Sequence, residues 1–324
     1  MKLLVTGGLG FIGSNFILNI LKNNSDITVT NVDAELIGSD PSNLDELNDS
    51  SNYKYVKGNI TNKILMEKLI ENSDCVVNFA AESFVDRSIV DANQFLVSNI
   101  RGTYTILEII RNHKKRFVQI STDEVFGSME IGSADEEHRL NPSNPYAATK
   151  ASAELLVNSY VNTYDLDCVI TRCTNNYGPR QFYEKLVPKA IFLAKQNKKI
   201  PIYGRGKNIR DWIYVDDHIE VLIKILLEGD IGEVYNIGAD QEISNIELVK
   251  TICEIFKNKL STDYDYKNLI TFIEDRPGHD FRYSINSKKI KEKFDFKPKY
   301  NFKDGIYQTI EWYINNSKWL LKKN

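Results

Sequence analysis

Apolar runs and amphipathic segments alternate along the first half of the chain. The apolar runs predict strands at residues 2–6, 27–32, 53–57, 74–79, 116–120 and 167–171. The amphipathic segments predict a helix that ends near residue 22 and further helices at residues 62–71, 91–112 and 146–164. Strands that alternate with helices in this way favour an α/β fold with a Rossmann-type, doubly wound parallel sheet and right-handed connections.

This alternation weakens after Arg172. Helices are predicted at residues 185–196, 215–228 and 245–257 and from residue 302, and strands at residues 234–237 and 270–273. Ser244 and Glu247 have the spacing of a capping box before the third of these helices. We expect a Rossmann domain at residues 1–172 and a smaller C-terminal α/β region at residues 173–324, with segments near residues 212–240 returning to the sheet.

Gly7, Gly10 and Gly13 form the spacing G-x-x-G-x-x-G between the first strand and the first helix. A turn of this kind lets the backbone approach a pyrophosphate, which the helix N-terminus attracts through its partial positive charge. A glycine-rich string alone is a weak signal, but this one lies between a strand and a helix. Asp33 ends the second strand, 20 residues after Gly13, where a carboxylate accepts hydrogen bonds from ribose hydroxyls. An acid there repels a 2′-phosphate, so the pattern predicts NAD rather than NADP.

Polar residues follow the fifth predicted strand, at the end of the sheet where open α/β proteins bind their ligands. Thr122, Asp123 and Glu124 provide a hydroxyl and two carboxyls there. Tyr146 and Lys150 stand four residues apart near the start of a predicted helix and therefore share one of its faces. Together these side chains indicate a catalytic site; on its own, the acidic pair is more typical of a solvated turn.

Composition narrows the class of protein. The formal net charge of the 324 residues is −3, so nothing favours a nucleic-acid partner or an anionic membrane surface. No apolar run approaches the ~18 residues of a membrane span, and the apolar start is too short for a signal peptide. The 4 cysteines include no Cys-x-x-Cys pair, which favours free thiols in a reducing, cytoplasmic compartment. The 4 histidines lack the spacing of metal ligands, so we expect no metal site.

Many short segments match one known family, in order along the chain. The chain resembles the extended short-chain dehydrogenases/reductases and, within them, the nucleoside-diphosphate-glucose 4,6-dehydratases. The matching segments are residues 7–14, 31–34, 79–83, 85–88, 122–125, 146 with 150, 175–179, 184–188, 201–204, 210–212 and 275–280. The chain departs from the family pattern at Phe84, where the family has histidine, in the residues after Asp33, and in a shorter stretch between Gly127 and Tyr146.

The resemblance implies which residues hold each ligand. It places NAD against Gly7, Gly10, Phe11, Ile12, Gly13, Asp33, Asn59, Ile60, Phe79, Ala80, Ala81, Ser83, Ser98, Tyr146, Lys150 and Asn176. It places a nucleotide sugar, mainly in residues 173–324, against Ser83, Thr122, Asn175, Lys185, Leu186, Pro201, Tyr203, Arg210, Asn245, Arg276 and His279. Lys185, Arg210 and Arg276 are the cations expected at the diphosphate. Family members are commonly homodimers that pair the helices beginning near residues 91 and 146.

The implied reaction is dehydration of a nucleotide-linked glucose to its 4-keto-6-deoxy product, a step in deoxysugar synthesis of the rhamnose type. dTDP-glucose is the expected substrate and UDP-glucose the alternative, since the two bases differ by one methyl group. Tyr146, with its pKa lowered by Lys150 and by the nicotinamide, is expected to take the proton of the 4-hydroxyl, whose oxygen Thr122 hydrogen-bonds. Glu124 is expected to remove the C5 proton and Asp123 to protonate the leaving 6-hydroxyl, while tightly bound NAD is recycled.

Two conditions and three alternatives accompany this hypothesis. Both acids reach one sugar only if the chain turns at residues 122–124, because neighbours on an extended strand point to opposite faces. Burial and like charge are expected to push the pKa values of the two acids apart.

A 4-epimerase and a nucleotide-sugar decarboxylase of the same superfamily fit Tyr146 and Lys150 but do not need Asp123. A non-enzymatic NAD-binding sensor or scaffold is the third alternative, and the intact set of catalytic side chains disfavours it.

Overall fold

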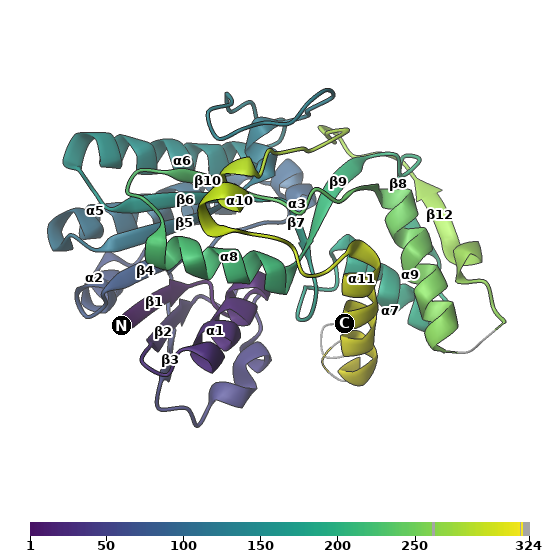
Figure 1. The fold of residues 1–324 in the computed structure, drawn as a ribbon, viewed down its shortest axis with the longest axis horizontal. Helices are drawn as coiled ribbons and strands as arrows, with labels where there is room; N and C mark the ends of the chain where they lie inside the picture. Colours follow the sequence, from purple (N-terminus) through teal and green to yellow (C-terminus); the bar gives the residue numbers. More distant parts are fainter. Residues whose placement is uncertain (261–262, 318, 320–324) are drawn as a thin grey trace.

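Seven parallel strands form the central sheet of the computed structural model, which describes residues 1–260, 263–317 and 319 (Figure 1). The strand order is β10-β6-β5-β4-β1-β2-β3. The strands are β1 (Lys2–Thr6), β2 (Thr28–Asp33), β3 (Tyr53–Lys57), β4 (Cys75–Asn78), β5 (Arg116–Thr122), β6 (Cys168–Cys173) and β10 (Val234–Ile237). The predicted doubly wound, Rossmann-type sheet is confirmed, and β3 and β10 have the predicted bounds.

Helices cover both faces of this sheet because the side chains of each strand alternate between two hydrophobic cores. Leu3 and Val5 of β1 pack with α1 (Phe11–Asn23) and α8 (Val215–Glu228) on one face. Leu4 packs into the core of the opposite face. The helices of that opposite face are α2 (Lys63–Glu71), α5 (Thr103–His113) and α6 (Pro145–Tyr164).

The strand order reverses between β1 and β4, which are neighbours in the sheet but not in the sequence. From β1 the chain runs outward through β2 and β3, and it then returns to begin the other half of the sheet at β4. Ligands of open parallel sheets bind in the crevice outside the C-terminal ends of the strands at such a reversal. The topology therefore brings the segments that follow β1, β4 and β5 to the same edge.

The helix predicted at residues 91–112 is present from Asn93 to His113, but it is not a single α-helix. The segment contains three elements, α4 (Asn93–Phe95), the π-helical η2 (Leu96–Gly102) and α5. In η2 the hydroxyl of Ser98 and the amide oxygen of Asn99 accept hydrogen bonds from the backbone N–H of Glu82, at 3.2 and 2.9 Å. The wider turn of a π-helix thus holds the chain that leaves β4, a long-range contact that helical periodicity does not encode.

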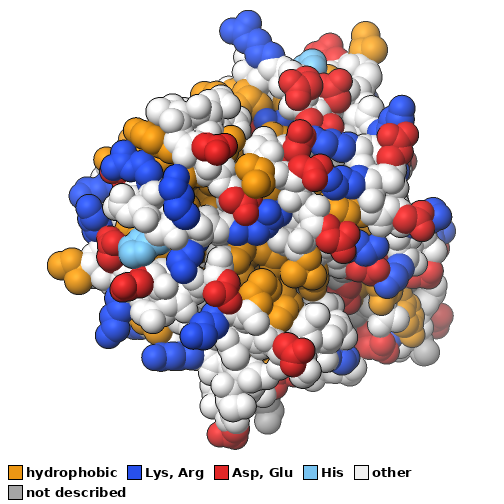
Figure 2. All heavy atoms as spheres, turned by 60° about the vertical axis from the view of Figure 1, so that its left-hand side comes forward, with side chains coloured by type: hydrophobic (Ala, Val, Ile, Leu, Met, Phe, Trp, Pro, Cys, Tyr) orange, Lys and Arg blue, Asp and Glu red, His pale blue; other side chains and the backbone are white. Residues whose placement is uncertain are grey.

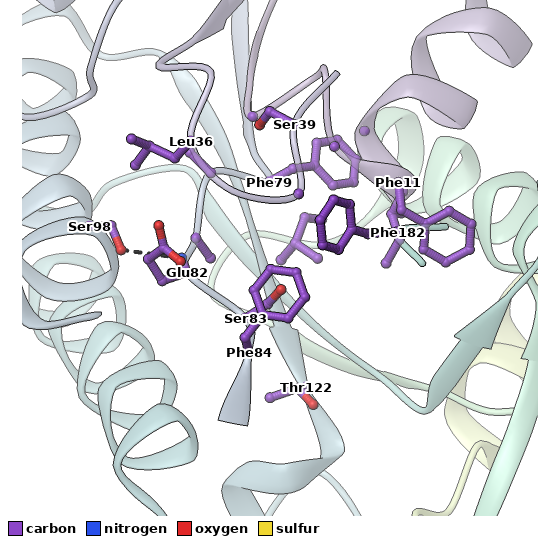
Figure 3. A pocket seen from close by; sticks show the side chains of 18 of the residues that line it. Phe11, Leu36, Ser39, Phe79, Glu82, Ser83, Phe84, Ser98, Thr122 and Phe182 are labelled. Carbon is purple, nitrogen blue, oxygen red and sulfur yellow. Dashed lines mark hydrogen bonds between the residues drawn. The ribbon is translucent and has the colours of Figure 1, made fainter. Parts of the chain in front are cut away.

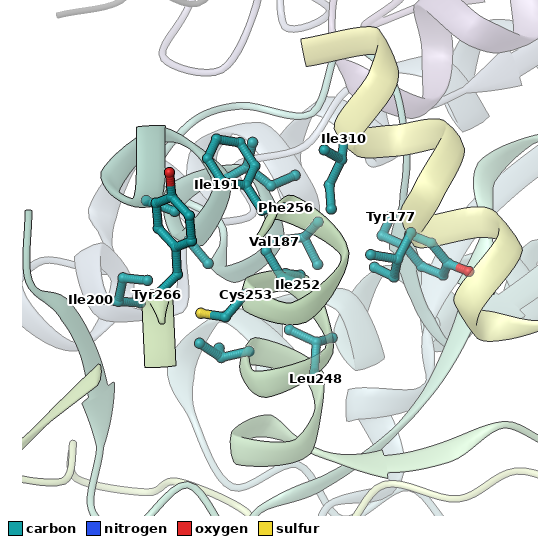
Figure 4. Close-up of a cluster of buried hydrophobic side chains, with 14 of the residues drawn as sticks. Tyr177, Val187, Ile191, Ile200, Leu248, Ile252, Cys253, Phe256, Tyr266 and Ile310 are labelled. Carbon is teal, nitrogen blue, oxygen red and sulfur yellow. The ribbon is translucent and has the colours of Figure 1, made fainter. Parts of the chain in front are cut away.

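A further hydrophobic core lies in the C-terminal region, beside the sheet (Figures 1 and 4). Its side chains come mainly from three helices, α7 (Leu186–Lys195), α9 (Asn245–Lys259) and α11 (Phe302–Asn315). The capping box predicted for α9 is confirmed. The Ser244 hydroxyl accepts from the backbone N–H of Glu247, and the Glu247 carboxylate accepts from the backbone N–H of Ser244.

Two small sheets complete this region. One pairs β8 (Ile200–Tyr203) in parallel with β12 (Ile270–Ile273). The other contains β7 (Asn175–Tyr177), β9 (Ile209–Tyr214) and β11 (Glu242–Ser244). The remaining helical elements include η1 (Pro41–Leu47), η4 (Tyr266–Leu269) and α10 (Lys288–Phe294). Although they follow residue 172, α8 and β10 lie on the main sheet; the division into domains at that residue stays a prediction.

Lys and Arg side chains are interspersed with Asp and Glu side chains over the face shown in Figure 2, in keeping with the net charge of −3. Cys75, Cys168, Cys173 and Cys253 are buried free thiols. Among the helices of the described residues, none combines the length and the apolar character needed to cross a bilayer.

Substituting Ile252, in the C-terminal core, tests how much that core contributes to stability. Its side chain is 0% exposed, so Ile252→Ala is expected to lower the free energy of unfolding by about 2–5 kcal/mol through lost burial and a residual cavity. Ile64→Ala is the matched control, because this isoleucine of α2 is 86% exposed and its loss is expected to change stability by less than ~0.5 kcal/mol. Urea unfolding of both variants measures the difference; equal effects would contradict the assigned core.

Candidate active site

The glycine turn after β1 lets two parts of the backbone approach closely. Gly7 has a φ of +70°, and a Cβ added there would lie 2.6 Å from the Cα of Ala80, just beyond β4. A Cβ at Gly13 would lie 2.6 Å from the carbonyl oxygen of Gly7. The bare backbone and the N-terminus of α1, whose N-cap is Gly10, therefore form the kind of cradle that a dinucleotide pyrophosphate requires.

Asp33 is fixed at the end of β2. Its carboxylate accepts hydrogen bonds from the backbone N–H of Leu9 at 3.0 Å and of Glu35 at 2.8 Å, and burial raises its pKa. The side-chain oxygen of Asn59, at the end of β3, accepts from the backbone N–H and the hydroxyl of Thr61. The side chain of Asn59 thus stabilises the turn that follows it. Asp33 and Asn59 also line the pocket described next.

One pocket lies at the C-terminal edge of the sheet, and all residues predicted to contact the cofactor line it. Thr122, Asp123 and Glu124 line the same pocket, as do Ser83, Asn175 and Lys185 from the predicted substrate set. Figure 3 shows aromatic side chains around the space, with Thr122 at the lower end and Ser98 beside Glu82 at one side. The lining residues that we did not predict include Leu36, Ser39, Phe84, Cys173, Thr174, Gln181 and Phe182.

The chain turns directly after Thr122, as it must if both acids are to face one ligand. Thr122 ends β5 in an extended conformation, with φ −145° and ψ 153°, and the 3-10 helix η3 (Asp123–Phe126) follows directly. The Thr122 hydroxyl caps this short helix by accepting from the backbone N–H of Glu124 at 3.3 Å. Because η3 breaks the strand alternation, Asp123 and Glu124 both line the pocket rather than opposite faces of the sheet.

Asp123 is the most constrained of the acids at this site. Its side chain is 3% exposed, one carboxyl oxygen accepts from the Thr122 hydroxyl at 3.2 Å, and the other has no partner among the described residues. Burial, and then the charge of Glu124, raise the pKa of Asp123 well above its ordinary value, while Arg210 opposes the rise. The carboxyl therefore favours its protonated form, as a general acid requires.

Tyr146 and Lys150 lie on one face of α6 and line the pocket. The lowering of the Tyr146 pKa that we expect from Lys150 and the nicotinamide together stays a prediction, because in the protein alone the shift is upward. Burial, and then the charge of Glu124, raise the pKa of Tyr146 well above its ordinary value. The Lys150 ammonium donates to the backbone carbonyl of Ile120 at 2.6 Å, and burial lowers its pKa to about 8 while Glu154 opposes the fall. The two acids of η3 therefore affect the pKa of the Tyr146 phenol more than Lys150 does.

Seven predicted substrate residues do not line this pocket: Leu186, Pro201, Tyr203, Arg210, Asn245, Arg276 and His279. Arg210 lies 4.0 Å from the ring centre of Tyr283 and donates to the carbonyl of Asp280 at 2.9 Å. The Tyr283 hydroxyl donates to the carboxylates of Asp280, at 2.7 Å, and Glu124, at 3.3 Å. A chain of contacts thus joins Arg210 to Glu124 through Tyr283, a residue that our sequence analysis did not select.

Tyr203 and Arg276 meet on a residue to which we had assigned no role. The carboxylate of Asp86 accepts from the Tyr203 hydroxyl at 3.0 Å and from the Arg276 guanidinium at 3.1 Å. His279 hydrogen-bonds Asp275 at 2.6 Å, within the loop that carries Arg276. Asp86 belongs to the matched segment 85–88, so the family resemblance was the one signal that pointed toward it.

Phe84, the departure from the family pattern, is buried beside the pocket. Its ring contacts that of Phe182 edge to face, with the ring centres 5.4 Å apart. The Lys185 ammonium lies 4.7 Å from the centre of the Phe84 ring and donates to the carbonyl of Ser83 at 2.8 Å. A cation–π contact and one hydrogen bond therefore hold Lys185 at the pocket.

Several predicted site residues carry a buried polar atom that has no protein partner among the described residues. These atoms are the second carboxyl oxygen of Asp123, the amide oxygens of Asn175 and Asn245, and Nε of Arg276. Buried polar groups nearly always have a hydrogen-bonding partner, because desolvation without one is costly. The pattern fits a site whose hydrogen bonds are completed by a polar ligand.

Comparison with known proteins gives a consistent result over nearly the whole chain. A family model described as GDP-mannose 4,6 dehydratase matches residues 4–309. The chain is 45% identical over 319 residues to the low-salt glycan biosynthesis protein Agl12 of Haloferax volcanii, covering 98% of this chain and 100% of that one. It is 42% identical over 342 residues to dTDP-glucose 4,6-dehydratase 1 of Escherichia coli strain K12, covering 99% of this chain and 94% of that one. The crystal structure of dTDP-glucose 4,6-dehydratase from Bacillus anthracis in complex with NAD is similar, with a TM-score of 0.90 and 40% identity, covering 100% of both chains.

Asp123→Asn is expected to stabilise the fold at alkaline pH. The folded-state pKa of Asp123 is raised, so its contribution to stability is present below the unfolded value of 3.8 and is lost as pH rises through the folded pKa. The amide keeps the size of the side chain without the charge. The free energy of unfolding is expected to increase by about 0.5–2 kcal/mol at pH 8 and to approach the wild-type value below pH 3.8.

Urea unfolding at the two pH values measures this gain. Asp49→Asn is the matched control, because this carboxyl is exposed and its neutralisation is expected to change stability little at either pH. An Asp123→Asn variant that is no more stable than the wild type at pH 8 would show that burial does not penalise the charged acid.

Proposed function

Because this chain belongs to the GDP-mannose 4,6 dehydratase family, we propose that it is an NAD-dependent dTDP-glucose 4,6-dehydratase. It is a lyase that removes water across C5 and C6 of the hexose and leaves the 4-keto-6-deoxy sugar on the nucleotide. The buried carboxyl of Asp123, which lines the pocket with one unpartnered oxygen among the described residues and whose pKa burial raises, carries this conclusion, since loss of water needs an acid at the leaving oxygen.

The chain's own residues fit an NAD molecule at the glycine turn. Gly7 and Gly13 leave backbone where any side chain would collide, and Asp33 stands at the end of β2 for the ribose hydroxyls. When bound, NAD supplies the acceptor and the returning donor of one hydride, so the net reaction is redox-neutral. Tyr146 and Lys150 line the same pocket as this cradle, which puts the proton-transfer groups beside the cofactor.

Tyr146 is the base for the 4-hydroxyl, and Thr122 hydrogen-bonds the same oxygen. Since burial raises the pKa of Tyr146 in the protein alone, its deprotonation depends on positive charge near the phenol, from Lys150 and from the nicotinamide. Oxidation at C4 makes the C5 proton acidic, and Glu124 removes it. Asp123 then protonates the departing 6-hydroxyl. The sugar finally regains the hydride at C6 and a proton at C5, which gives the 4-keto-6-deoxy product.

The two neighbouring acids have environments that suit these different tasks. Asp123 is buried with one unpartnered oxygen, whereas Glu124 is half-buried and accepts a hydrogen bond from the Tyr283 hydroxyl. Burial favours the neutral form of Asp123, which suits the acid, and Glu124 stands beside it at the pocket as the proposed base.

The substrate's diphosphate is bound by Lys185, Arg210 and Arg276, with Asn175 and Asn245 at the sugar and nucleotide. The dTDP form is proposed over the UDP form on the similarity to dTDP-glucose enzymes. A methyl group in a pocket is worth only ~1 kcal/mol, so UDP-glucose is the substrate to compare.

The protein acts as a cytoplasmic homodimer that pairs the η2–α5 and α6 surfaces. Large apolar side chains on these helices face solvent in the single chain, among them Leu96, Tyr104, Leu155 and Tyr164. Apolar patches of this kind are typical of interfaces between subunits. The buried free thiols fit a reducing compartment, which supports the cytoplasmic location.

Turnover of the two nucleotide sugars tests the proposal directly. The purified protein is expected to carry NAD and to convert dTDP-glucose faster than UDP-glucose into a product with the alkaline absorbance of a 4-keto sugar. A galactose product would identify a 4-epimerase, which needs Tyr146 and Lys150 but not Asp123. Absence of product from either nucleotide sugar would favour the sensor or scaffold.

Asp123→Asn separates oxidation from water loss. The variant is expected to oxidise C4 and then to stall, with dehydrated product formed about 10²–10⁴-fold more slowly than by the wild type. Mass spectrometry of quenched reactions distinguishes the 4-keto-glucose nucleotide from the product that has lost water. Asp49→Asn serves again as the control, and wild-type turnover by Asp123→Asn would remove this residue from the proposed role.

A further inference from the structure

A short segment between β4 and η2 makes a continuous series of contacts with the C-terminal region. It contains α3 (Val85–Val90), whose first turn faces the loop before α7. Just before the helix, Phe84 packs edge to face on Phe182, and within it the Arg87 guanidinium pairs with the Glu184 carboxylate at 2.7 Å. Asp86 stands between these two positions in the sequence but contacts a different part of the C-terminal region.

Asp86 uses both carboxylate oxygens to hold two side chains. One oxygen accepts from Nη1 of Arg276 at 3.1 Å, and the other accepts from the Tyr203 hydroxyl at 3.0 Å. The partners lie 190 and 117 residues further along the chain, in the loop after β12 and at the end of β8. A single carboxylate therefore fixes the relative placement of a cation and a phenol that come from separate segments.

The hydrogen-bonding state of Arg276 shows what remains free for a ligand. Its side chain is 19% exposed, whereas that of Asp86 is 54% exposed. Asp86 engages Nη1 alone, and Nε is buried with no partner within the described part of the chain. A guanidinium is a planar fork, so holding one N–H also fixes the direction of the others. The unpartnered N–H is thus held ready for an acceptor.

Lys185 supplies a second cation close to this fork. It lines the pocket, and the charges of both Arg276 and Asp86 act on its pKa, which burial lowers. The two cations therefore lie near each other, and Asp86, which holds Arg276, also holds Tyr203. Two cations beside a phenol suit a diphosphate that carries a planar base.

We propose that Asp86 is a positioning residue for the nucleotide half of the substrate: it holds Arg276 against the diphosphate and Tyr203 beside the base. This inference rests on the proposed function. Asp86 makes no contact with the reacting carbons and takes no part in proton transfer.

The sign of the effect separates this role from simple electrostatics. If Asp86 acted only as a negative charge near an anionic substrate, neutralising it would tighten nucleotide binding. If it orients Arg276, neutralising it loosens a long side chain and weakens binding, because the arginine must be ordered anew each time the ligand binds. The two accounts thus predict opposite changes in affinity.

The test compares Asp86→Asn with Asp91→Asn in the NAD-loaded protein. Asp91 is an exposed acid at the end of the same helix, so its substitution removes the same charge nearby without touching Arg276. Asp86→Asn is expected to weaken thymidine diphosphate about tenfold in calorimetry and to raise the KM for dTDP-glucose similarly, with kcat within about twofold of wild type. Asp91→Asn is expected to leave all three values near those of the wild type.

A double-mutant cycle asks whether Asp86 acts through Arg276. In an Arg276→Gln background, adding Asp86→Asn is expected to produce little further loss of affinity. A full tenfold loss in that background, or unchanged or tighter binding in the single variant, would overturn the proposal. NAD content and melting temperature are measured alongside, because an unfolded variant would lower both.

These measurements also distinguish failure of the role of Asp86 from failure of the proposed function. A wild-type protein that turns over dTDP-glucose, together with an Asp86→Asn variant of normal affinity, removes the role of Asp86 and leaves the proposed function intact. A wild-type protein that neither binds thymidine diphosphate nor turns over dTDP-glucose contradicts the proposed function itself.

Discussion

The burial of one carboxyl group, that of Asp123, is the constraint on which the site depends. The end of β5 and the turn into η3 place this acid where water is excluded and leave one of its oxygens unpartnered among the described residues. An unpaired buried acid opposes folding, and a fold retains such a group most readily where a ligand or a reaction uses it. Its neighbours follow from this placement: Thr122 supports one oxygen, and the nearby charge of Glu124 helps to keep the proton on Asp123.

Arg172, on β6, ties α6, which carries Tyr146 and Lys150, to η3, which carries the two acids. From β6 it donates to the buried Glu154 carboxylate of α6 at 3.0 and 2.8 Å, and its guanidinium lies 4.8 Å from the ring centre of Phe126 in η3. Glu154 follows Lys150 by one helical turn, and Phe126 closes the turn that contains Glu124. Breaking a buried ion pair leaves an uncompensated charge, so the arrangement fixes α6 relative to η3. The Tyr283 hydroxyl, which donates to Glu124 at 3.3 Å, then joins the second half of the protein to this frame.

Local patterns in the sequence were enough to predict the sheet and the dinucleotide turn. The alternation in β1, the glycines from Gly7 to Gly13 and the acid at Asp33 act within a few residues or one βαβ unit, and the structure places them as expected. The π-helical turn inside the helix predicted at residues 91–112 was missed, because its contacts with the backbone of Glu82 lie outside the helix and leave no local pattern. In the protein alone, burial and the charge of Glu124 raise the pKa of Tyr146, and the Lys150 ammonium is directed at a backbone carbonyl; the lowering expected with the nicotinamide stays a prediction.

The residues that sequence reasoning missed depend on contacts between distant segments. Tyr283 reaches Glu124 across 159 residues, and Asp86 reaches Arg276 across 190, so no local spacing could assign them. The family resemblance marked the segment around Asp86 as matched without indicating its partners. The substrate side chains of the C-terminal region were named from that resemblance, and most of them do not line the pocket.

The ionisation of Asp123 in the wild-type protein is the most direct test of its role as the acid. Carbon-13 NMR of protein labelled at aspartate carboxyls, with the Asp123 signal assigned by its loss in Asp123→Asn, follows the titration of this group. We expect the Asp123 carboxyl to stay protonated well above the ordinary pKa of 3.8. A signal that titrates near 3.8 would show an ionised carboxylate at the centre of the site and would contradict its role as the acid.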